Sequence, residues 1–489
     1  MRTPPLALCR RGRAFRLASA ALVLFLIAVL NGCGGGSGSA AAPTSPSPTQ
    51  AATTAVQINM GDSTADWMLA FSMNISSMTL TGSGGNVTVV STSTPMEMTH
   101  LMGAMQPLSM LNVPQGSYTG ATVTIGSAMV TYIDPATKTV QQQSIAGPMT
   151  GSVTFSSAVA AGSTPLAMNF DLDLGKSVTQ SAGGALTMSP VFQASWGAQG
   201  SGNPADYADG GIGAMMGAIS SVSGSSFSMT SMQAAGSFTF TTNSSTSFDG
   251  TTMSGMSSGM LVMVDAVLQP DGSLLATRVQ SMTGSGGMMG GGIITAATGQ
   301  PPTSLTLVMQ NGVGAGMMAS YLAEGATVNL GSNTTYEMYP DGIATSGLPF
   351  TPAFDATHIY AGQSVMPVSS GGMMGGSGGM GGMGGGMMGS TSMAGTISAS
   401  ELVLMPQGLA GTSSAALNNG SATSFTLTLP SGCAFTSLTG AASITVYQQA
   451  GTFIEGGTTI ASGADMHAFG LLFYDGGQWK MVALRLGAN

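Results

Sequence analysis

The stretch GMLVMVDAVLQPDGSLLATRVQ, residues 259–280, indicates the fold class of this 489-residue chain. Two runs rich in Val, Leu and Met flank the pair Asp271-Gly272, which favours a tight turn between two antiparallel strands. A second hairpin signal, Asp475-Gly476, lies between similar runs near the C-terminus. These patterns predict an all-β protein.

The first large region, residues 55–200, is predicted to form a β-sandwich. Short runs rich in Val, Ile, Thr and aromatic residues alternate there with Gly, Pro, Asn and Asp, and no helical period of useful length competes. In LAMNFDLDL, residues 166–174, apolar residues alternate with Asn169, Asp171 and Asp173. This alternation predicts a half-buried strand with one polar face.

The remainder contains a weak internal repeat, with units at residues 210–282, 290–407 and 408–489. Each unit has an opening strand pair, a middle with Thr followed closely by an aromatic residue, and a closing pair joined by a turn. The middle stretches are SSTSFDG, SNTTYEM and GTFIEGG. Units of this size predict three small β-barrel-like domains of about five or six strands.

Two resemblances to bacterial families follow from these stretches. GDSTADWMLAFSMNISSMTLT, VPQGSYTGATVTIGSAMVTYID and STPLAMNFDLDL resemble the exported family called domain of unknown function 4382. The repeat units, with openings such as VSGSSFSM and endings such as DGSLLATRVQ, resemble the family called domain of unknown function 5666. The resemblances imply an all-β fold and a cell-envelope setting, and they imply no catalytic residues.

The N-terminus has the organisation of an export signal. Five arginines precede an apolar run from Leu17 to Leu30, and the following Asn31-Gly32-Cys33 resembles a bacterial lipobox, whose cysteine is acylated. The sequence therefore predicts a lipoprotein signal peptide over residues 1–32, lipidation of Cys33 and a flexible tether over 33–54. A plain signal peptide or membrane anchor is the alternative. We expect an exported protein that is lipid-anchored in the cell envelope, at the outer membrane.

Charge and cysteine content exclude several classes of function. Removal of residues 1–32 leaves five basic and nineteen acidic residues, a net charge of −14. Nucleic-acid binding requires clustered Lys and Arg, so a nucleic-acid partner is excluded. Apart from Cys33, the exported chain contains only Cys433, so no disulfide within its body and no cysteine-rich metal site is expected.

No combination of side chains predicts catalysis. His100, His358 and His467 lie in different units without metal-ligand spacing, and two G-x-S-x-G matches, centred on Ser257 and Ser377, precede no helix. The paired carboxylates Asp171 with Asp173, and Asp62 with Asp66, could bind calcium, but solvated surface positions are the simpler interpretation. We expect a non-enzymatic protein without a cofactor.

Two alternatives to a structural or interaction role remain. Trp67, Trp196 and Trp479 could stack on sugar rings of a glycan or other envelope polymer, although Trp is mostly buried on average. The tract GGMMGGSGGMGGMGGGMMGS, residues 371–390, could bind Cu(I), because thioether sulfur is a soft ligand. Its methionines are Met373, Met374, Met380, Met383, Met387 and Met388.

The simpler interpretation of that tract is a disordered insertion, residues 369–394, within the second repeat unit. Ordering a Gly-rich loop costs about 1–2 kcal/mol per residue, and no His or Cys lies in the tract. Shorter Met-Gly copies occur at 213–217 and 286–291, just before opening strands of repeat units. We therefore interpret Met-Gly runs as joints, with oxidant scavenging by the thioethers as a further possibility.

Overall fold

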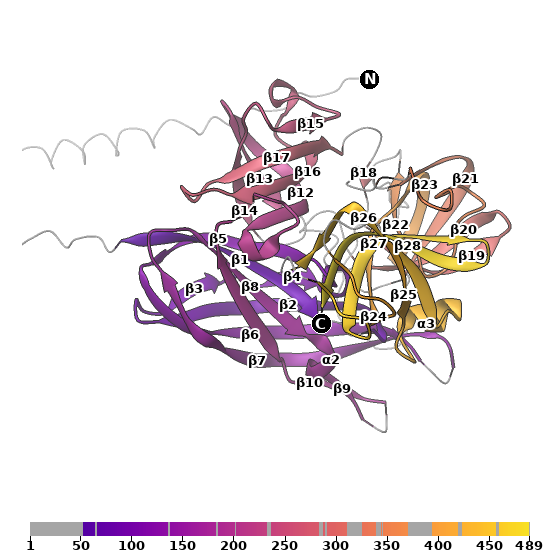
Figure 1. Cartoon of the computed structure of the whole chain (residues 1–489), viewed down its shortest axis with the longest axis horizontal. Coiled ribbons are helices and arrows are strands. Elements are labelled where there is room, and N and C mark those ends of the chain that lie inside the picture. The colour runs from indigo at the N-terminus through magenta and orange to yellow at the C-terminus, as the bar shows by residue number, and fades with distance from the viewer. Residues whose placement is uncertain are drawn as a thin grey trace, which may run out of the picture. The chain divides into compact units, whose positions relative to one another are not determined.

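A computed structural model describes residues 52–488, and strands make up most of this range (Figure 1). The prediction of an all-β chain with barrel-like units is confirmed. Within the described residues, none of the helices has the length and apolar character needed to cross a lipid bilayer. The gaps are residues 64–65, 135–136, 182–183, 201, 232–235, 283–286, 289–290, 311–324, 339–343, 345, 370–393, 419–422 and 456–458.

One sheet of the N-terminal region has four strands in the order β11-β8-β1-β5. Its central pair, β1 and β8, is parallel, and the two flanking pairs are antiparallel. The strands are β1 (Thr53–Ser63), β5 (Met105–Pro114), β8 (Leu166–Asp173) and β11 (Phe192–Ala198).

A second sheet completes the sandwich with the order β3-β2-β6-β7, and β4 pairs with β2. Val56 and Phe170 from the first sheet share one buried core with Phe71 and Val123 from the second. The strands are β2 (Met68–Gly82), β3 (Val87–Val90), β4 (Thr94–Glu97), β6 (Gly116–Ile133) and β7 (Val140–Ala161). The short elements η1 (Thr99–Leu101), α2 (Leu174–Ser177), β9 (Val178–Gln180) and β10 (Leu186–Met188) connect them.

Strand β8 differs from the prediction of a half-buried strand with one polar face. Seven of its eight residues are buried, including Asn169 and Asp173. The physical reason is that its second face is covered by the 3-10 turn η2 (Tyr207–Asp209), which packs against both β8 and β11. Asn169 is satisfied by accepting a hydrogen bond of 2.7 Å from the Asn59 amide on β1.

The first repeat unit is a closed ring of five strands, β12-β13-β14-β17-β16, in which β14 and β17 are parallel. A sixth short strand, β15, extends the parallel pairing with β17. The elements are β12 (Gly211–Ser223), β13 (Ser226–Ser231), β14 (Ser237–Thr241), β15 (Ser247–Asp249), η3 (Met253–Gly255), β16 (Leu261–Leu268) and β17 (Leu274–Ser281).

The second unit repeats this ring as β19-β20-β21-β23-β22, again with one parallel pair, β21 and β23. The short strand β18 pairs with β22 outside the ring. The strands are β18 (Gly287–Met288), β19 (Gly292–Gly299), β20 (Pro302–Met309), β21 (Gly325–Met338), β22 (Ser364–Ser369) and β23 (Ala394–Leu404).

The third unit is the closed barrel β24-β25-β26-β28-β27, whose parallel pair is β26 and β28. All three rings therefore have the strand order 1-2-3-5-4 with strands 3 and 5 parallel, as in a small Greek-key barrel of the OB type. The elements are β24 (Gln407–Ser413), β25 (Thr423–Thr428), α3 (Ala434–Thr439), β26 (Ser443–Ile454), β27 (Asp465–Asp475) and β28 (Gln478–Ala488).

A threonine bridge recurs at the same place in each barrel, where pairing between the third and fifth strands is interrupted. The threonine hydroxyl donates to an alanine carbonyl of the fifth strand, and the backbone amide three residues earlier donates to that hydroxyl. The bonds to the carbonyl are Thr246 to Ala276 at 2.7 Å, Thr334 to Ala399 at 2.8 Å and Thr452 to Ala483 at 2.7 Å. The amide bonds from Asn243, Gly331 and Gln449 measure 3.0, 2.9 and 2.8 Å.

These bridges explain the threonine in the repeated sequence signal. The interrupted pairing would leave backbone groups without partners, and the hydroxyl supplies both an acceptor and a donor. Strand pairing resumes directly after the threonine in each barrel, at Ser247, Thr335 and Phe453.

The shorter Met-Gly copies do not all act as joints. Residues 213–217 lie inside β12, where the side chains of Met215 and Met216 are buried. Part of the copy at 286–291 forms β18. Interpreting the copy at 213–217 as a joint was therefore wrong, because strand pairing takes it into the sheet of the first barrel. Among the described residues of the other copy, Gly287 and Met288 pair with β22 between the first and second barrels, so that interpretation stays a prediction. The long tract at 371–390 and the predicted signal and lipidation site lie outside the described residues.

Candidate functional site

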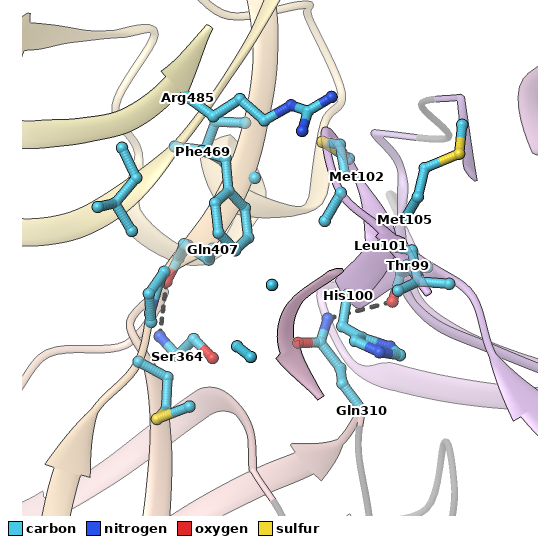
Figure 2. Close-up of a pocket in the computed structure, with 18 of the residues that line it drawn as sticks. Thr99, His100, Leu101, Met102, Met105, Gln310, Ser364, Gln407, Phe469 and Arg485 are labelled. Carbon is cyan, nitrogen blue, oxygen red and sulfur yellow. Dashed lines mark hydrogen bonds between the residues drawn. The ribbon is translucent and has the colours of Figure 1, made fainter. Parts of the chain in front are cut away.

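A cavity of about 450 Å³ is bounded by residues from the sandwich and from all three barrels. Figure 2 shows Phe469, Gln407 and Ser364 on one side of the open space, facing Leu101 and the rest of the η1 turn on the other. The cavity therefore lies where several domains meet, and interfaces between domains are a common location for ligand pockets.

The η1 turn is held by the Glu97 carboxylate at the end of β4. Its oxygens accept hydrogen bonds from the Phe71, Thr99 and His100 amides at 2.8, 3.1 and 3.1 Å. The Thr99 hydroxyl and the His100 Nδ1 add contacts of 2.6 and 2.7 Å. Gln310, from the second barrel, donates to the Leu69 carbonyl at 2.8 Å and to the Thr99 hydroxyl at 3.2 Å, so this turn also fixes the second barrel to the sandwich.

A second polar cluster lies on the third barrel and joins Arg485, Glu455 and His467. Arg485 Nε donates to Glu455 Oε1 at 2.5 Å, and His467 Nε2 contacts the same oxygen at 2.9 Å. Arg485 also donates to the Ala205 carbonyl and lies 4.2 Å from the centre of the Tyr207 ring. Burial alone would raise the pKa of Glu455, but the hydrogen bonds and charges of His467 and Arg485 lower it to about 2.

Neither cluster was recognised from the sequence. Glu97 lies between two methionines, and a carboxylate two residues before Thr99 is a weak signal for a capped turn. Arg485 offered a better signal, because a lone arginine in the apolar run MVALRL requires a buried partner.

Of the three histidines, the structure places two near the same turn. The His467 ring packs against Gly103, three residues after His100, and a Cβ on Gly103 would lie 2.6 Å from it. His358 instead contacts Asp355 at 2.9 Å in a separate, exposed turn. Over the described ranges, no three His, Cys, Asp or Glu side chains are grouped so that they could hold a metal ion.

The predicted carboxylate pairs are more buried than solvated surface positions would be. Asp173 caps α2 by accepting from the Lys176 amide at 2.9 Å and pairs with the Lys176 ammonium at 2.6 Å. The Ser63 hydroxyl donates to Asp171. Burial raises the pKa of Asp171, although the bond from Ser63 and the charge of His467 oppose the shift.

Asp62 is 5% exposed and lies within β1, two residues after the core residue Met60 and on the same face of the strand. Neither carboxylate oxygen has a hydrogen bond of normal geometry within the described residues. Burial, followed by the charges of Asp171 and Glu97, raises its pKa well above the ordinary value, and the Leu174 amide opposes this only in part. Asp66 lies in the loop before β2 and lines the cavity.

The three tryptophans pack against protein. Trp67 makes an edge contact with Tyr132 at 5.6 Å, and Trp196 lies 5.3 Å from Phe155. Trp479 is buried against its cross-strand neighbour Tyr474, with ring centres 5.1 Å apart. Trp67 and Trp196 remain partly exposed, so glycan binding through them stays a prediction.

The remaining predicted groups separate into two sets. Ser257 lies in a turn after η3 that leads into β16 rather than a helix, and Cys433 is buried as the cap of α3. Cys33, Ser377 and the six methionines of the long tract lie outside the described residues, so lipidation and Cu(I) binding stay predictions.

The comparison with family models matches residues 216–280, most of the first barrel, to a family described as "Domain of unknown function (DUF5666)". This agrees with the resemblance of the repeat units. The search of curated proteins gave no match.

Proposed function

We propose that this chain is a non-catalytic protein of the bacterial cell envelope, anchored by a lipid on Cys33, with a structural or interaction role. The basic N-terminus, the apolar run and Cys33 support export and lipidation. The membrane is the first partner under this proposal, and an envelope protein or glycan is the second.

The observation that carries the non-catalytic part is how the reactive side chains are used. Glu97, Asp173 and Glu455 accept hydrogen bonds that hold turns or connect units. Cys433 caps a helix rather than facing a base. In an active site we would expect a nucleophile hydrogen-bonded to a general base, and these groups have structural partners instead.

The anchor is tested by metabolic labelling with a clickable fatty acid. Cys33→Ala should abolish labelling and release the protein from the membrane fraction. Cys433→Ala is the matched control and should be labelled like the wild type, because that cysteine is buried in the third barrel. Persistent labelling of the Cys33→Ala protein would refute the lipid anchor.

We further propose that the second and third barrels are divergent copies of the matched first barrel, and that the sandwich belongs with domain of unknown function 4382. Support for the copies comes from the common strand order and from the threonine bridge at equivalent positions. Substituting Thr246, Thr334 and Thr452 by valine tests this equivalence, because each change should destabilise its own barrel.

A further inference from the structure

The walls of the cavity between the sandwich and the three barrels are mostly apolar and unusually rich in methionine. Flexible thioether side chains adapt to ligands of different shape, which is why methionine is frequent at permissive binding surfaces. Aromatic rings add apolar surface, and their faces attract cations, as Arg485 shows by lying over the rings of Tyr207 and Phe453. The methionines are Met68, Met102, Met105, Met215, Met216, Met263 and Met405, and the aromatic rings belong to Tyr207, Phe435, Phe453 and Phe469.

Both arginines of the cavity already have counter-charges. Arg485 pairs with Glu455, and Arg278 pairs with Asp249 at 2.6 Å. The carboxylate of Asp265 accepts from the Ala214 amide at 2.7 Å and lies across the strand pair from Arg278. Two arginines and three carboxylates sum to a net charge of −1, and the additional carboxylate, Asp265, is held by the Ala214 amide beside Arg278.

Asp66 is different from the other charged residues of the cavity wall. Its carboxylate has no hydrogen-bond or ion-pair partner among the described residues, and burial raises its pKa to about 6. Its backbone carbonyl accepts from the Ala434 amide at 2.6 Å, which fixes it next to Phe435, another wall residue. The cavity therefore combines a carboxylate that has no partner among the described residues with apolar and aromatic walls.

We propose that this cavity binds an amphipathic organic cation, an amine or quaternary ammonium attached to an apolar body. The Asp66 carboxylate neutralises the cationic head, and the methionine and aromatic walls enclose the body. A volume of about 450 Å³ is within the usual range for small-molecule sites, roughly 300–1,000 Å³. The inference does not depend on the lipid anchor, so either proposal can fail without the other.

The test uses three probes with one body and different heads: 4-phenylbutylammonium, 4-phenylbutanol and 4-phenylbutyrate. Affinities are measured by isothermal titration calorimetry on the complete exported chain carrying Cys33→Ala, so that no attached lipid competes. The pH is held well above 6, where Asp66 is ionised. We expect the ammonium to bind about tenfold tighter than the alcohol, and the carboxylate to bind weakest.

Three variants show which residues are responsible. Asp66→Asn should weaken the ammonium by about tenfold and leave the alcohol unchanged. Asp271→Asn is the matched control, because Asn-Gly keeps the hairpin turn and the position does not line the cavity; it should change neither affinity. Ser364→Phe, which enlarges a wall residue, should weaken all three probes (Figure 2).

The proposal is overturned if the ammonium and the alcohol bind the wild type equally, or if none of the probes binds. It is also overturned if Asp66→Asn leaves the ammonium affinity unchanged while its circular dichroism matches the wild type. Equal binding before and after Ser364→Phe would place the probes elsewhere and would exclude this cavity.

Discussion

The first and second barrels have the same strand order but are stabilised by different sets of residues. The buried residues of the first barrel's cluster all come from residues 212–279, and Met110 of β5 packs against them from the sandwich, so this unit has a core that is almost entirely its own. The cluster of the second barrel also includes Met216 and Met263 from the first barrel, and Leu471, Phe473 and Val482 from the third. Two barrels with identical topology can therefore differ in whether they fold without their neighbours, because each unit is stabilised mainly by the hydrophobic residues that it buries.

The largest expected difference concerns excised fragments. Residues 210–282 should fold alone, whereas residues 290–407 should not, because part of their core is missing. Circular dichroism and amide NMR dispersion measure this. A fragment of residues 290–489 is the control and should regain structure, since it restores Phe473 and its neighbours. Cooperative unfolding of the isolated 290–407 fragment would contradict the comparison.

Core substitutions test the same difference in the whole chain. Phe473→Ala and Phe227→Ala each remove a ring that is 1% exposed and should each cost about 3–5 kcal/mol. Hydrogen exchange should increase in both the second and third barrels for Phe473→Ala. For Phe227→Ala it should increase in the first barrel alone. Exchange confined to the third barrel in Phe473→Ala would mean that the shared core does not couple the two units.

The threonine bridge should contribute less to stability in the first barrel than in the second and third barrels. Thr452→Val and Thr334→Val leave buried backbone groups without partners and should each cost about 1–3 kcal/mol in urea unfolding. Thr246 is partly exposed, so Thr246→Val should cost less because water can replace the hydroxyl. Serine at each position should restore most of the stability. A larger loss for serine than for valine would show that the methyl group matters rather than the hydroxyl.

At acidic pH the smallest change is expected at Asp62, which lies in the sandwich, outside the three barrels, and provides a reference for them. The pKa of Asp62 is higher in the folded state than its ordinary value of 3.8. Its contribution to the free energy of unfolding is therefore complete below pH 3.8 and is lost as the pH rises through the folded-state pKa. Asp62→Asn should therefore be more stable than the wild type at neutral pH and equal to it in acid. Urea midpoints across pH measure this, and a difference that stays constant from acid to neutral pH would show that folding does not raise the pKa of Asp62.

Sequence patterns predicted the class of fold because they report local periodicity. Alternating apolar residues and Asp-Gly turns predict strands and hairpins wherever one face is buried. The same rule failed for β8, since nothing in LAMNFDLDL shows that the distant turn η2 covers its polar face. It also failed at residues 213–217, where glycines within β12 look like a linker when strand pairing is unknown.

The cavity could not be predicted from local patterns, because each of its walls comes from a different unit. Asp66 was recognised as a carboxylate near a loop, but its place in the cavity wall beside α3, where its carbonyl accepts from the Ala434 amide, depends on the tertiary structure. The contact of His467 with Gly103 likewise joins residues more than 300 positions apart in the sequence. Side-chain type alone identified candidates, and only the tertiary structure showed which of them meet.

The threonine bridges also show how much length a barrel of this topology tolerates. The bridging threonine and the alanine whose carbonyl it contacts are 30 residues apart in the first barrel, 65 in the second and 31 in the third. The entropy of loop closure changes by only about 0.6 kcal/mol for each doubling of length. Extra chain between the third and fifth strands is therefore nearly neutral for folding, and this position in the second barrel could accept a Gly/Met-rich insertion during evolution without a compensating change in the core.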